Sequence, residues 1–310
     1  MTATASTPFR AAFAALALAA CASAATAAAP DPAWVDDLAK WRTRADTSLT
    51  RERGWLSIVS RDELAPGTYT IGSAPDSKIV LPKGLAPAHL GVVVVSADRA
   101  RLELAKGQKM RTVSRSGTDE IEEFTARDLI TGGTRLEWVT SGRLSLQFVK
   151  REDGKVVVRA ADRESPRRKN FAGRVWFDPK AEFKVPAKFV PTAQGATIPI
   201  ANVRGEIAYE KVAGTLEFAV NGQKMTLDAL DDEGNLFIIF RDGTSNSATY
   251  PPGRFLFIEK PKDGQWVVDF NKAYNPPCAF SAFTTCPLPP PQNWLKSDVA
   301  AGEKYAGRKS

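Results

Sequence analysis

The chain has 310 residues, enough for two domains with their own cores or for one large domain. Hydrophobic residues make up 43% and charged residues 25%, which is the range of globular proteins and excludes global disorder. Beyond the N-terminus no apolar run reaches about twenty residues, so we predict no internal membrane span.

The first residues have the composition of a secretory signal. Arg10 precedes the run AAFAALALAACASAATAAAP, so residues 1–29 are predicted to be a signal peptide. Two cleavage modes stay open. LAAC, which ends at Cys21, is similar to a bacterial lipobox, whose cysteine is lipidated and anchors the protein to a membrane. ATA or TAA before Pro30 suits an ordinary signal peptidase. Either mode predicts an exported protein, periplasmic or lipid-anchored in the envelope.

The net charge of the mature chain limits which classes of partner are expected. Without Arg10 the mature chain keeps 41 basic and 35 acidic residues, a balance of +6. A basic surface can bind nucleic acid, but an exported protein meets little of it, so no nucleic-acid partner is expected. An envelope glycan, a peptide or an anionic surface fits better, and a membrane enters only through the lipid anchor.

Two cysteines near the C-terminus predict a disulfide. Cys278 and Cys286 are the thiols left after processing, and export places them in an oxidising compartment. The closed loop would contribute about 2.5 kcal/mol on the chain-entropy model. The chain has one histidine, His89, and no further cysteine nearby, so no metal site is expected. We expect no organic cofactor either.

Residues 30–54 predict an amphipathic helix. Asp31 suits the N-cap and Pro32 the first helical position, while Gly54 is expected to end the helix. One apolar stripe at helical spacing comprises Trp34, Leu38, Trp41, Ala45 and Leu49. We expect this stripe to pack on the β-domain that follows.

Residues 55–160 show alternating patterns broken by turn residues, which predicts an antiparallel β-sandwich. The expected strands are GTYTIG, KIVL, LGVVVV, ARLEL, TRLEWVT, LSLQFVK and KVVVRAA. Within them, IGSAPDSKIVLPKGLAPAHLG resembles the forkhead-associated pattern. That family has an arginine and a serine where this chain has Ser73 and Ala86, so the resemblance implies a similar sandwich without phosphopeptide binding.

Residues 161–199 are predicted to be a linker with KFVP as a short edge strand. Their basic cluster could seat an anion or form a solvated face; it comprises Arg163, Arg167, Arg168 and Lys169. Residues 200–310 predict a second antiparallel β-domain or meander, in which Asn221-Gly222 makes a type I′ hairpin turn. NLFIIFRD, GRFLFIEK and QWVVDFN are further strands, and a disulfide-stapled, proline-rich tail completes the domain. The expected fold is thus mostly β.

Two polar stretches of the C-terminal half carry the candidate site, RDGTSNSATYPPGRF and DFNKAYNPPCAFSAFTTCPLPPPQNW. The candidate ligand or active-site residues are Arg241, Asp242, Thr244, Tyr250, Arg254, Asp269, Asn271, Tyr274, Asn275 and Glu303. No motif of a serine hydrolase, a phosphate-binding loop or a zinc protease is present, and His89 is expected to be a structural or surface residue.

Three readings of these residues stay open. Their polar side chains could only satisfy the backbone of tight loops. They could form a polar-aromatic binding surface, which is the preferred reading. They could instead serve a hydrolase that uses Asp242, Asp269 or Glu303 beside arginines. Convergence of the carboxylates and arginines with Tyr250 and Tyr274 in one pocket would favour a ligand or active site.

FRDGTSNSATYPPGRFL, VDFNKAYNPPCAFSAFTTCPLPPPQNWL and AGEKY together resemble the domain-of-unknown-function 1684 family of bacterial proteins. GWLSI and IGSAPDSKIVLP are similar to its N-terminal part. The resemblance is most specific over residues 160–305. It implies a mostly β protein and carries over no established catalytic residue.

Overall fold

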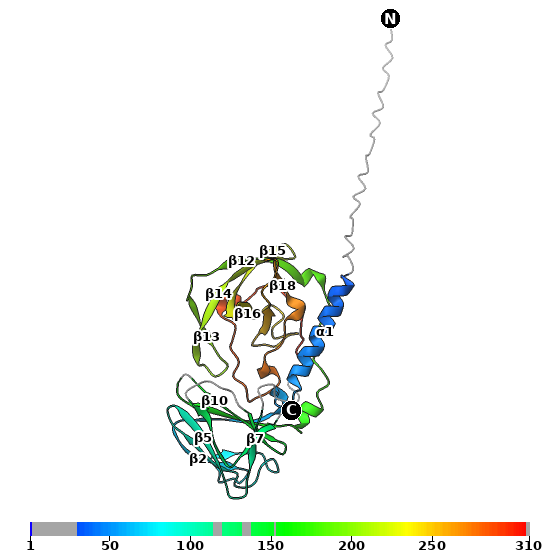
Figure 1. Ribbon diagram of the computed structural model, residues 1–310. Coiled ribbons are helices and arrows are strands. Elements are labelled where there is room, and N and C mark those ends of the chain that lie inside the picture. Colours follow the sequence, from blue (N-terminus) through cyan, green and yellow to red (C-terminus); the bar gives the residue numbers. More distant parts are fainter. Residues whose placement is uncertain (2–29, 114–119, 132–137, 152, 308–310) are drawn as a thin grey trace.

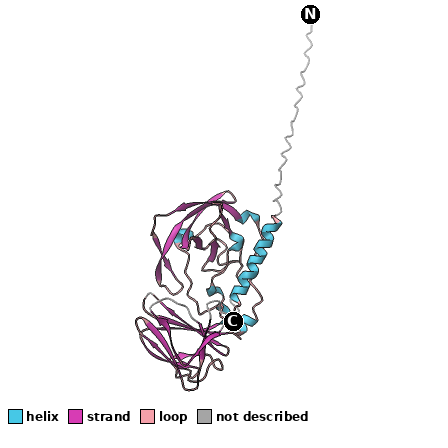
Figure 2. Ribbon diagram, viewed as in Figure 1, coloured by secondary structure: helices cyan, strands magenta, loops and turns pink. Residues whose placement is uncertain are grey.

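The computed structural model describes the chain except for residues 2–29, 114–119, 132–137, 152 and 308–310. The predicted signal peptide and Cys21 therefore lie outside the described residues. The protein is mostly β, with 45% strand and 14% helix, and strands dominate both of its lobes (Figure 2). The predicted fold class is confirmed, including the N-terminal helix and the antiparallel sheets.

Helix α1 (Pro32–Leu49) begins as predicted, because the Asp31 side chain accepts a hydrogen bond from the main-chain N–H of Ala33. It ends five residues before Gly54, where a short 3-10 turn, η1 (Trp55–Ser57), follows. The predicted end was therefore wrong, and so was the packing partner. Figure 1 shows α1 beside the lobe that holds β18, not beside the first β-domain.

The reason lies in the two tryptophans of the helix. Trp34 donates from Nε1 to a carboxylate oxygen of Asp269 at 2.8 Å. The ring of Trp41 lies 5.7 Å from that of Trp176 and 6.2 Å from that of Tyr274, centroid to centroid. Aromatic partners and a buried acceptor for the indole N–H exist in the C-terminal half, so the stripe docks there.

The N-terminal sandwich consists of two sheets. One has the order β1 (Ile58–Leu64), β11 (Val156–Asp162), β10 (Leu144–Lys150), β9 (Trp138–Ser141), β6 (Met110–Val113) and β7 (Glu120–Phe124). The other has the order β3 (Ile79–Val80), β2 (Gly67–Gly72), β4 (Gly91–Val95), β5 (Arg99–Leu104) and β8 (Ala126–Thr131). Alternate residues such as Val93, Leu102, Leu146 and Val158 are fully buried in one core, as a sandwich requires.

The connection to the second lobe holds its basic residues close to the protein. Helix α2 (Pro166–Lys169) is followed by the short turn η2 (Ala181–Phe183). Arg167 donates to the carbonyl of Ile58, Arg168 donates to the carbonyls of Thr50 and Arg163, and Lys169 pairs with Glu164. Three of the four predicted cations thus brace the chain, which leaves little for an anion.

The C-terminal sheet has the order β17 (Arg254–Ile258), β16 (Asn235–Phe240), β15 (Gln223–Asp232), β14 (Ile207–Val220), β12 (Lys184–Pro191) and β18 (Trp266–Asp269). A further strand, β13 (Thr197–Ala201), pairs with the first part of β14. The Asn221-Gly222 turn is confirmed, since both residues have positive φ, 51° and 76°.

The predicted simple meander needs one correction. β18 follows β17 in the chain but pairs with β12, so the two strands form opposite ends of the sheet order. In β12 residues 187–191 pair with β14 and residues 184–187 pair with β18, so KFVP has one strand neighbour. Residues 184–191 belong to the segment predicted as linker. The predicted domain boundaries stay predictions.

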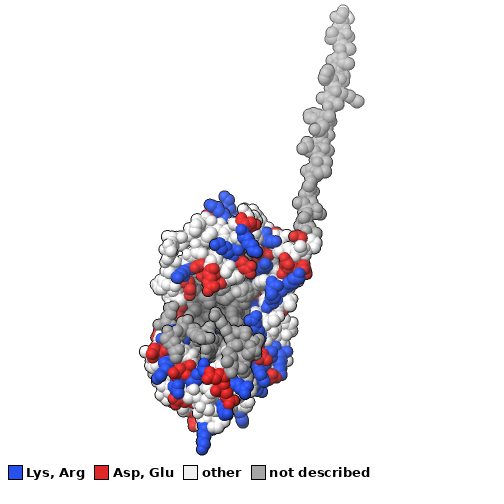
Figure 3. All heavy atoms as spheres, viewed as in Figure 1, with Lys and Arg blue, Asp and Glu red and all other residues white. Residues whose placement is uncertain are grey.

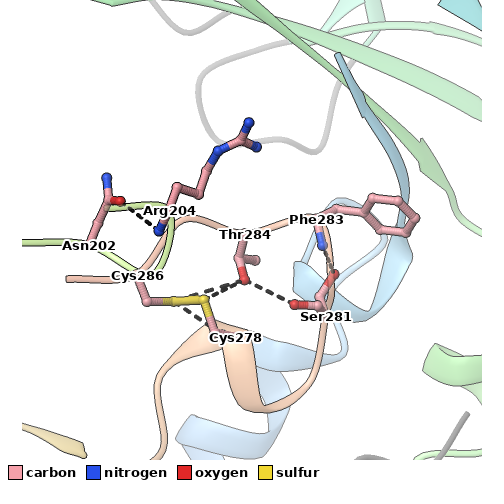
Figure 4. The surroundings of a disulfide bond; sticks show 7 residues. All are labelled: Asn202, Arg204, Cys278, Ser281, Phe283, Thr284 and Cys286. Carbon is pink, nitrogen blue, oxygen red and sulfur yellow. Dashed lines mark hydrogen bonds between the residues drawn. A yellow bond between two sulfur atoms is a disulfide. The ribbon is translucent and has the colours of Figure 1, made fainter. Parts of the chain in front are cut away.

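The tail covers the sheet as a stapled irregular segment. Cys278 and Cys286 form the predicted disulfide, with Cα atoms 6.1 Å apart, and both cysteines are buried (Figure 4). The hydroxyl of Thr284 lies inside the loop and donates to the carbonyl of Ser281. The cysteines share a core with Ile239 and Phe255 of the sheet. The short turns of the tail are η3 (Phe270–Lys272), η4 (Pro277–Ala279) and η5 (Pro291–Asn293).

Candidate functional site

Asp242 and Arg254 form a buried ion pair at the junction of β16 and β17. Arg254 Nη2 lies 2.5 Å from Asp242 Oδ2, and both side chains are 0% exposed. Thr244 donates to Asp242 Oδ1 from its main-chain N–H at 2.7 Å and from its hydroxyl at 2.5 Å. The guanidinium also donates to the carbonyls of Val299 and Ala301. This network ties the C-terminal segment to the sheet.

Such an arrangement does not present a reactive carboxylate. Asp242 faces an arginine, a threonine and main-chain groups, its side chain is 0% exposed, and it lines neither of the two cavities described below. A general base must touch the proton that it abstracts, directly or through one water. Asp242 is therefore a structural anchor. Arg241 does not join it: its guanidinium lies 5.1 Å from the ring centre of Trp294, which is 52% exposed.

Asp269 and Asn271 form a second network, which holds α1 against the tail. Asp269 accepts from the indole of Trp34 and from the main-chain and side-chain N–H groups of Asn271. The Asn271 amide also exchanges two hydrogen bonds with the main chain of Lys180, each 2.9 Å long. Every polar group of this pair has a local structural partner, as buried polar groups require.

Glu303 and Arg174 form a third network. Arg174 Nη1 lies 2.6 Å from Glu303 Oε2, and the same oxygen accepts from the main-chain N–H of Asn275 at 2.8 Å. Burial raises the pKa of Glu303 above its usual range, and the nearby charge of Arg174 opposes that rise. Arg174 also lies 4.8 Å from the ring centre of Phe280.

Tyr274 and Asn275 line a small open cavity beside this third network. The cavity has a volume of 260 Å³. Its walls are mainly aromatic; the lining residues are Ser48, Leu49, Trp55, Arg174, Phe237, Phe255, Tyr274, Asn275, Pro277 and Phe280. Pockets for drug-sized ligands span about 300–1,000 Å³, so this one suits a single ring or side chain.

Two polar atoms of the cavity-lining residues, Asn275 Oδ1 and Arg174 Nε, are buried without a hydrogen-bond partner among the described residues. The Asn275 amide nitrogen donates to the carbonyl of Lys304, which fixes the amide orientation. Its oxygen, Oδ1, is buried and accepts no hydrogen bond from any described residue. Burial raises the pKa of Tyr274 to about 12, so its hydroxyl stays neutral. An unsatisfied buried acceptor costs about 1–3 kcal/mol.

The ten predicted site residues thus separate into groups. Tyr274, Asn275 and Glu303 come together at or beside the cavity. Asp242, Thr244 and Arg254 form one buried anchor, and Asp269 and Asn271 form another. Tyr250 packs on Tyr305 with ring centres 4.9 Å apart. The carboxylates and arginines do not converge in one pocket among the described residues.

Arg174 and Trp55 line the cavity but were not among the predicted site residues. Arg174 lies in the segment predicted as linker, and Trp55 begins the first β-domain. Neither residue belongs to a recognisable catalytic or binding motif, and only the packing of α1 and the tail brings them to Tyr274.

The described residues contain no group of three or more histidines, cysteines and acids that could hold a metal ion. In the same residues, no helix has the length and apolar character that crossing a membrane requires.

The fold and the cavity define a mostly β protein with an aromatic-walled pocket at the junction of helix, linker and stapled tail. Residues 169–304 match the family model "Protein of unknown function (DUF1684)", and the chain belongs to this family through that region. The resemblance over residues 160–305 is confirmed, whereas GWLSI and the forkhead-like stretch lie outside the match.

Two further comparisons give little on activity. The solution NMR structure of the uncharacterized protein from gene locus rrnAC0354 of Haloarcula marismortui is similar in sequence, with 34% identity. That match covers 44% of this chain and 78% of the other, with a TM-score of 0.37. A search of curated proteins finds no match.

Proposed function

We propose that the protein is an exported binding module of the bacterial envelope, which holds one neutral sugar unit of an envelope glycan in the Tyr274–Asn275 cavity. The observation that carries the proposal is the open, aromatic-walled cavity lined by Tyr274 and Asn275. Aromatic walls suit the apolar face of a sugar ring, and the Tyr274 hydroxyl can exchange a hydrogen bond with one of its polar groups.

The charges favour a neutral ligand over an anionic surface. Arg174 is the only cation in the cavity wall, and Glu303 neutralises it at 2.6 Å. Lys and Arg side chains are interspersed with Asp and Glu over the face drawn in Figure 3, so that face offers no single-sign stripe for nucleic acid. The alternative ligand is a side chain of an envelope peptide, and the binding test below distinguishes it from a sugar.

The competing function, a hydrolase, has less support. The carboxylate oxygens of Asp242 and Asp269 accept hydrogen bonds from structural partners. Glu303 accepts from Arg174 and from the main-chain N–H of Asn275 in the tail. Among the described residues, the hydrogen-bond partners of these three carboxylates are structural ones, and they do not identify a reaction.

Export rests on the Arg10 leader and on the Cys278–Cys286 bond, which suits an oxidising compartment. The leader leaves lipidation at Cys21 and cleavage before Pro30 both open. Analysis of the mature N-terminus by mass spectrometry would separate the two, because a lipidated Cys21 would begin the anchored form.

The binding test uses protein-detected NMR with neutral N-acetylated sugars, and with short neutral peptides as the alternative. We expect sugars to shift the Asn275 side-chain amide, and Tyr274→Phe to weaken binding about two- to tenfold through loss of one hydrogen bond. Tyr209→Phe is the matched control, since Tyr209 is 74% exposed and remote from the cavity lining. If only the peptides cause shifts, the ligand is a peptide and not a glycan. If neither causes shifts, the proposal is refuted.

A further inference from the structure

A larger groove of 660 Å³ lies between α1 and the two end strands of the C-terminal sheet. Its lining shares no residue with the Tyr274–Asn275 cavity. Trp34 and Trp41 of α1 form one wall, while Phe257 of β17 and Val267 of β18 belong to the other. Because β17 and β18 do not pair with each other, the sheet is left with an open seam along this groove.

The edge of β17 faces the groove with free main-chain groups. Phe255 exchanges hydrogen bonds of 2.8 and 2.9 Å with the main chain of Tyr274, so its N–H and C=O point away from β16. In an antiparallel pair this direction alternates with every residue. The N–H and C=O of Phe257 therefore also point away from β16, towards the seam.

The edge of β18 is oriented in the same way. Lys184 of β12 stands opposite Asp269, but its N–H donates to the carbonyl of Ala181. This pair is thus not hydrogen-bonded across the strands. Two residues along, Pro186 stands opposite Val267 and has no N–H to donate. The N–H and C=O of Val267 therefore point away from β12 and into the groove.

These groups have no partner on the groove side within the described part of the chain. α1 covers the seam, but its main-chain groups are hydrogen-bonded within the helix, so it supplies no hydrogen bonds to the strand edges. The seam is bounded at one end by the Phe255–Tyr274 bridge and at the other by the connection at residues 259–265. Two unpaired strand edges with a groove between them form a template for one more strand.

We propose that this seam is a docking site for an extended peptide segment of a partner protein, which adds a strand at β17 and β18 beneath α1. Strand addition takes its affinity from main-chain hydrogen bonds, which a polypeptide supplies and a sugar or lipid does not. Val267 is 36% exposed at the seam, so an apolar side chain of the peptide gains contact there.

The charges of the groove do not select the sign of the peptide. The groove is lined by four cations, Lys40, Arg44, Lys184 and Lys272, and by four carboxylates, Asp31, Asp37, Glu259 and Asp269. Asp31 caps α1 and Asp269 accepts from Trp34, but a hydrogen bond from a neutral N–H group does not cancel the charge of a carboxylate. The formal charges of the lining therefore balance, so recognition rests on the main chain of the peptide and on its apolar side chains.

Hydrogen exchange on the intact protein tests the proposal. The probes are two pools of seven-residue peptides that alternate Val, Ile or Thr with Glu in one pool and with Lys in the other. Both pools are expected to slow exchange of the Phe257 and Val267 amides at least tenfold. The same pools N-methylated at alternate residues, which cannot donate along one edge, are expected to have no effect.

Val267→Pro removes one groove-facing donor that β12 does not use, and it should weaken binding of both pools about tenfold. Val267→Ala keeps the donor and is the matched control. If Val267→Pro does not fold, the N-methylated pools on the unaltered protein decide. Binding of one pool alone, protection at other strands only, no binding of either pool, or protection by self-association without peptide would each overturn the proposal.

Discussion

Asp242 and Arg254 illustrate how a cluster of chemically capable residues serves folding. Their ion pair is wholly buried, and Thr244 and two carbonyls of the C-terminal segment complete it. Breaking a buried pair costs more than forming it gains, because the remaining charge is left without compensation. The sequence identifies these residues as a cluster but does not say which way they face.

Asp242→Asn should destabilise the protein by about 3–5 kcal/mol, because Arg254 then keeps its charge in the core without a carboxylate. Urea unfolding measures the loss. Glu217→Gln, at the exposed pair with Lys188, is the matched control and should change stability by less than about 1 kcal/mol. A change of similar small size for Asp242→Asn would contradict the anchor role.

Glu303 gives the stability a particular pH dependence. Burial raises its pKa above the ordinary 4.5, so above that pH the folded state holds the proton more tightly than the unfolded state. Its contribution to stability is therefore present below about pH 4.5 and is lost as pH rises through the raised pKa. Relative to Glu303→Gln, the unaltered protein should lose stability over that window.

Asp162 is the matched comparison, because its contribution to stability depends on pH with the opposite sign. Arg143 holds the pKa of Asp162 below its ordinary 3.8, so that contribution is present above pH 3.8 and is lost as pH falls. Urea unfolding across pH for Glu303→Gln and Asp162→Asn should give differences of opposite slope. Equal slopes would show that the surroundings of Glu303 are wet rather than buried.

At the scale of elements, local patterns were enough for most strands. GTYTIG became β2 with the predicted bounds, and the Asn221-Gly222 turn joins β14 and β15 as expected. The pairing of β18 with β12 was not predictable in this way, since it joins residues about eighty positions apart and no local pattern encodes it. The partner of α1 was missed for the same reason.

The tail depends on its covalent closure. Replacing Cys278 and Cys286 by alanine together should cost about 2–3 kcal/mol and increase hydrogen exchange of residues 278–288, because these residues have few ladder hydrogen bonds. Exchange of β10 and β11 in the N-terminal sandwich should not change and serves as the internal control. Unchanged exchange in the tail would show that proline stiffness alone holds it.

At the scale of the whole molecule, α1 and the stapled tail organise the C-terminal lobe, and the cavity forms where they meet the linker. The sequence pointed to Tyr274 and Asn275 through their place in the proline-rich stretch. It could not point to Trp55 or Arg174, because the cavity exists only once α1 and the linker pack on the tail. A pocket assembled from distant segments is a property of the fold, not of any motif.

Export is a second prediction at this scale. The chain expressed in a bacterial host should be found outside the cytoplasm with residues 1–20 or 1–29 removed. If it sediments with membranes, Cys21→Ala should release it, whereas Cys278→Ala, which leaves the lipobox intact, should not. A cytoplasmic protein that still begins at Met1 would contradict the prediction.

The most direct test of the central claim is a crystal structure of the protein with a neutral N-acetylated sugar at saturating concentration. The account predicts the sugar ring against Tyr274 and Phe280, with one of its polar groups hydrogen-bonded to the Tyr274 hydroxyl. A cavity that holds only ordered water, with the sugar elsewhere or absent, would contradict it.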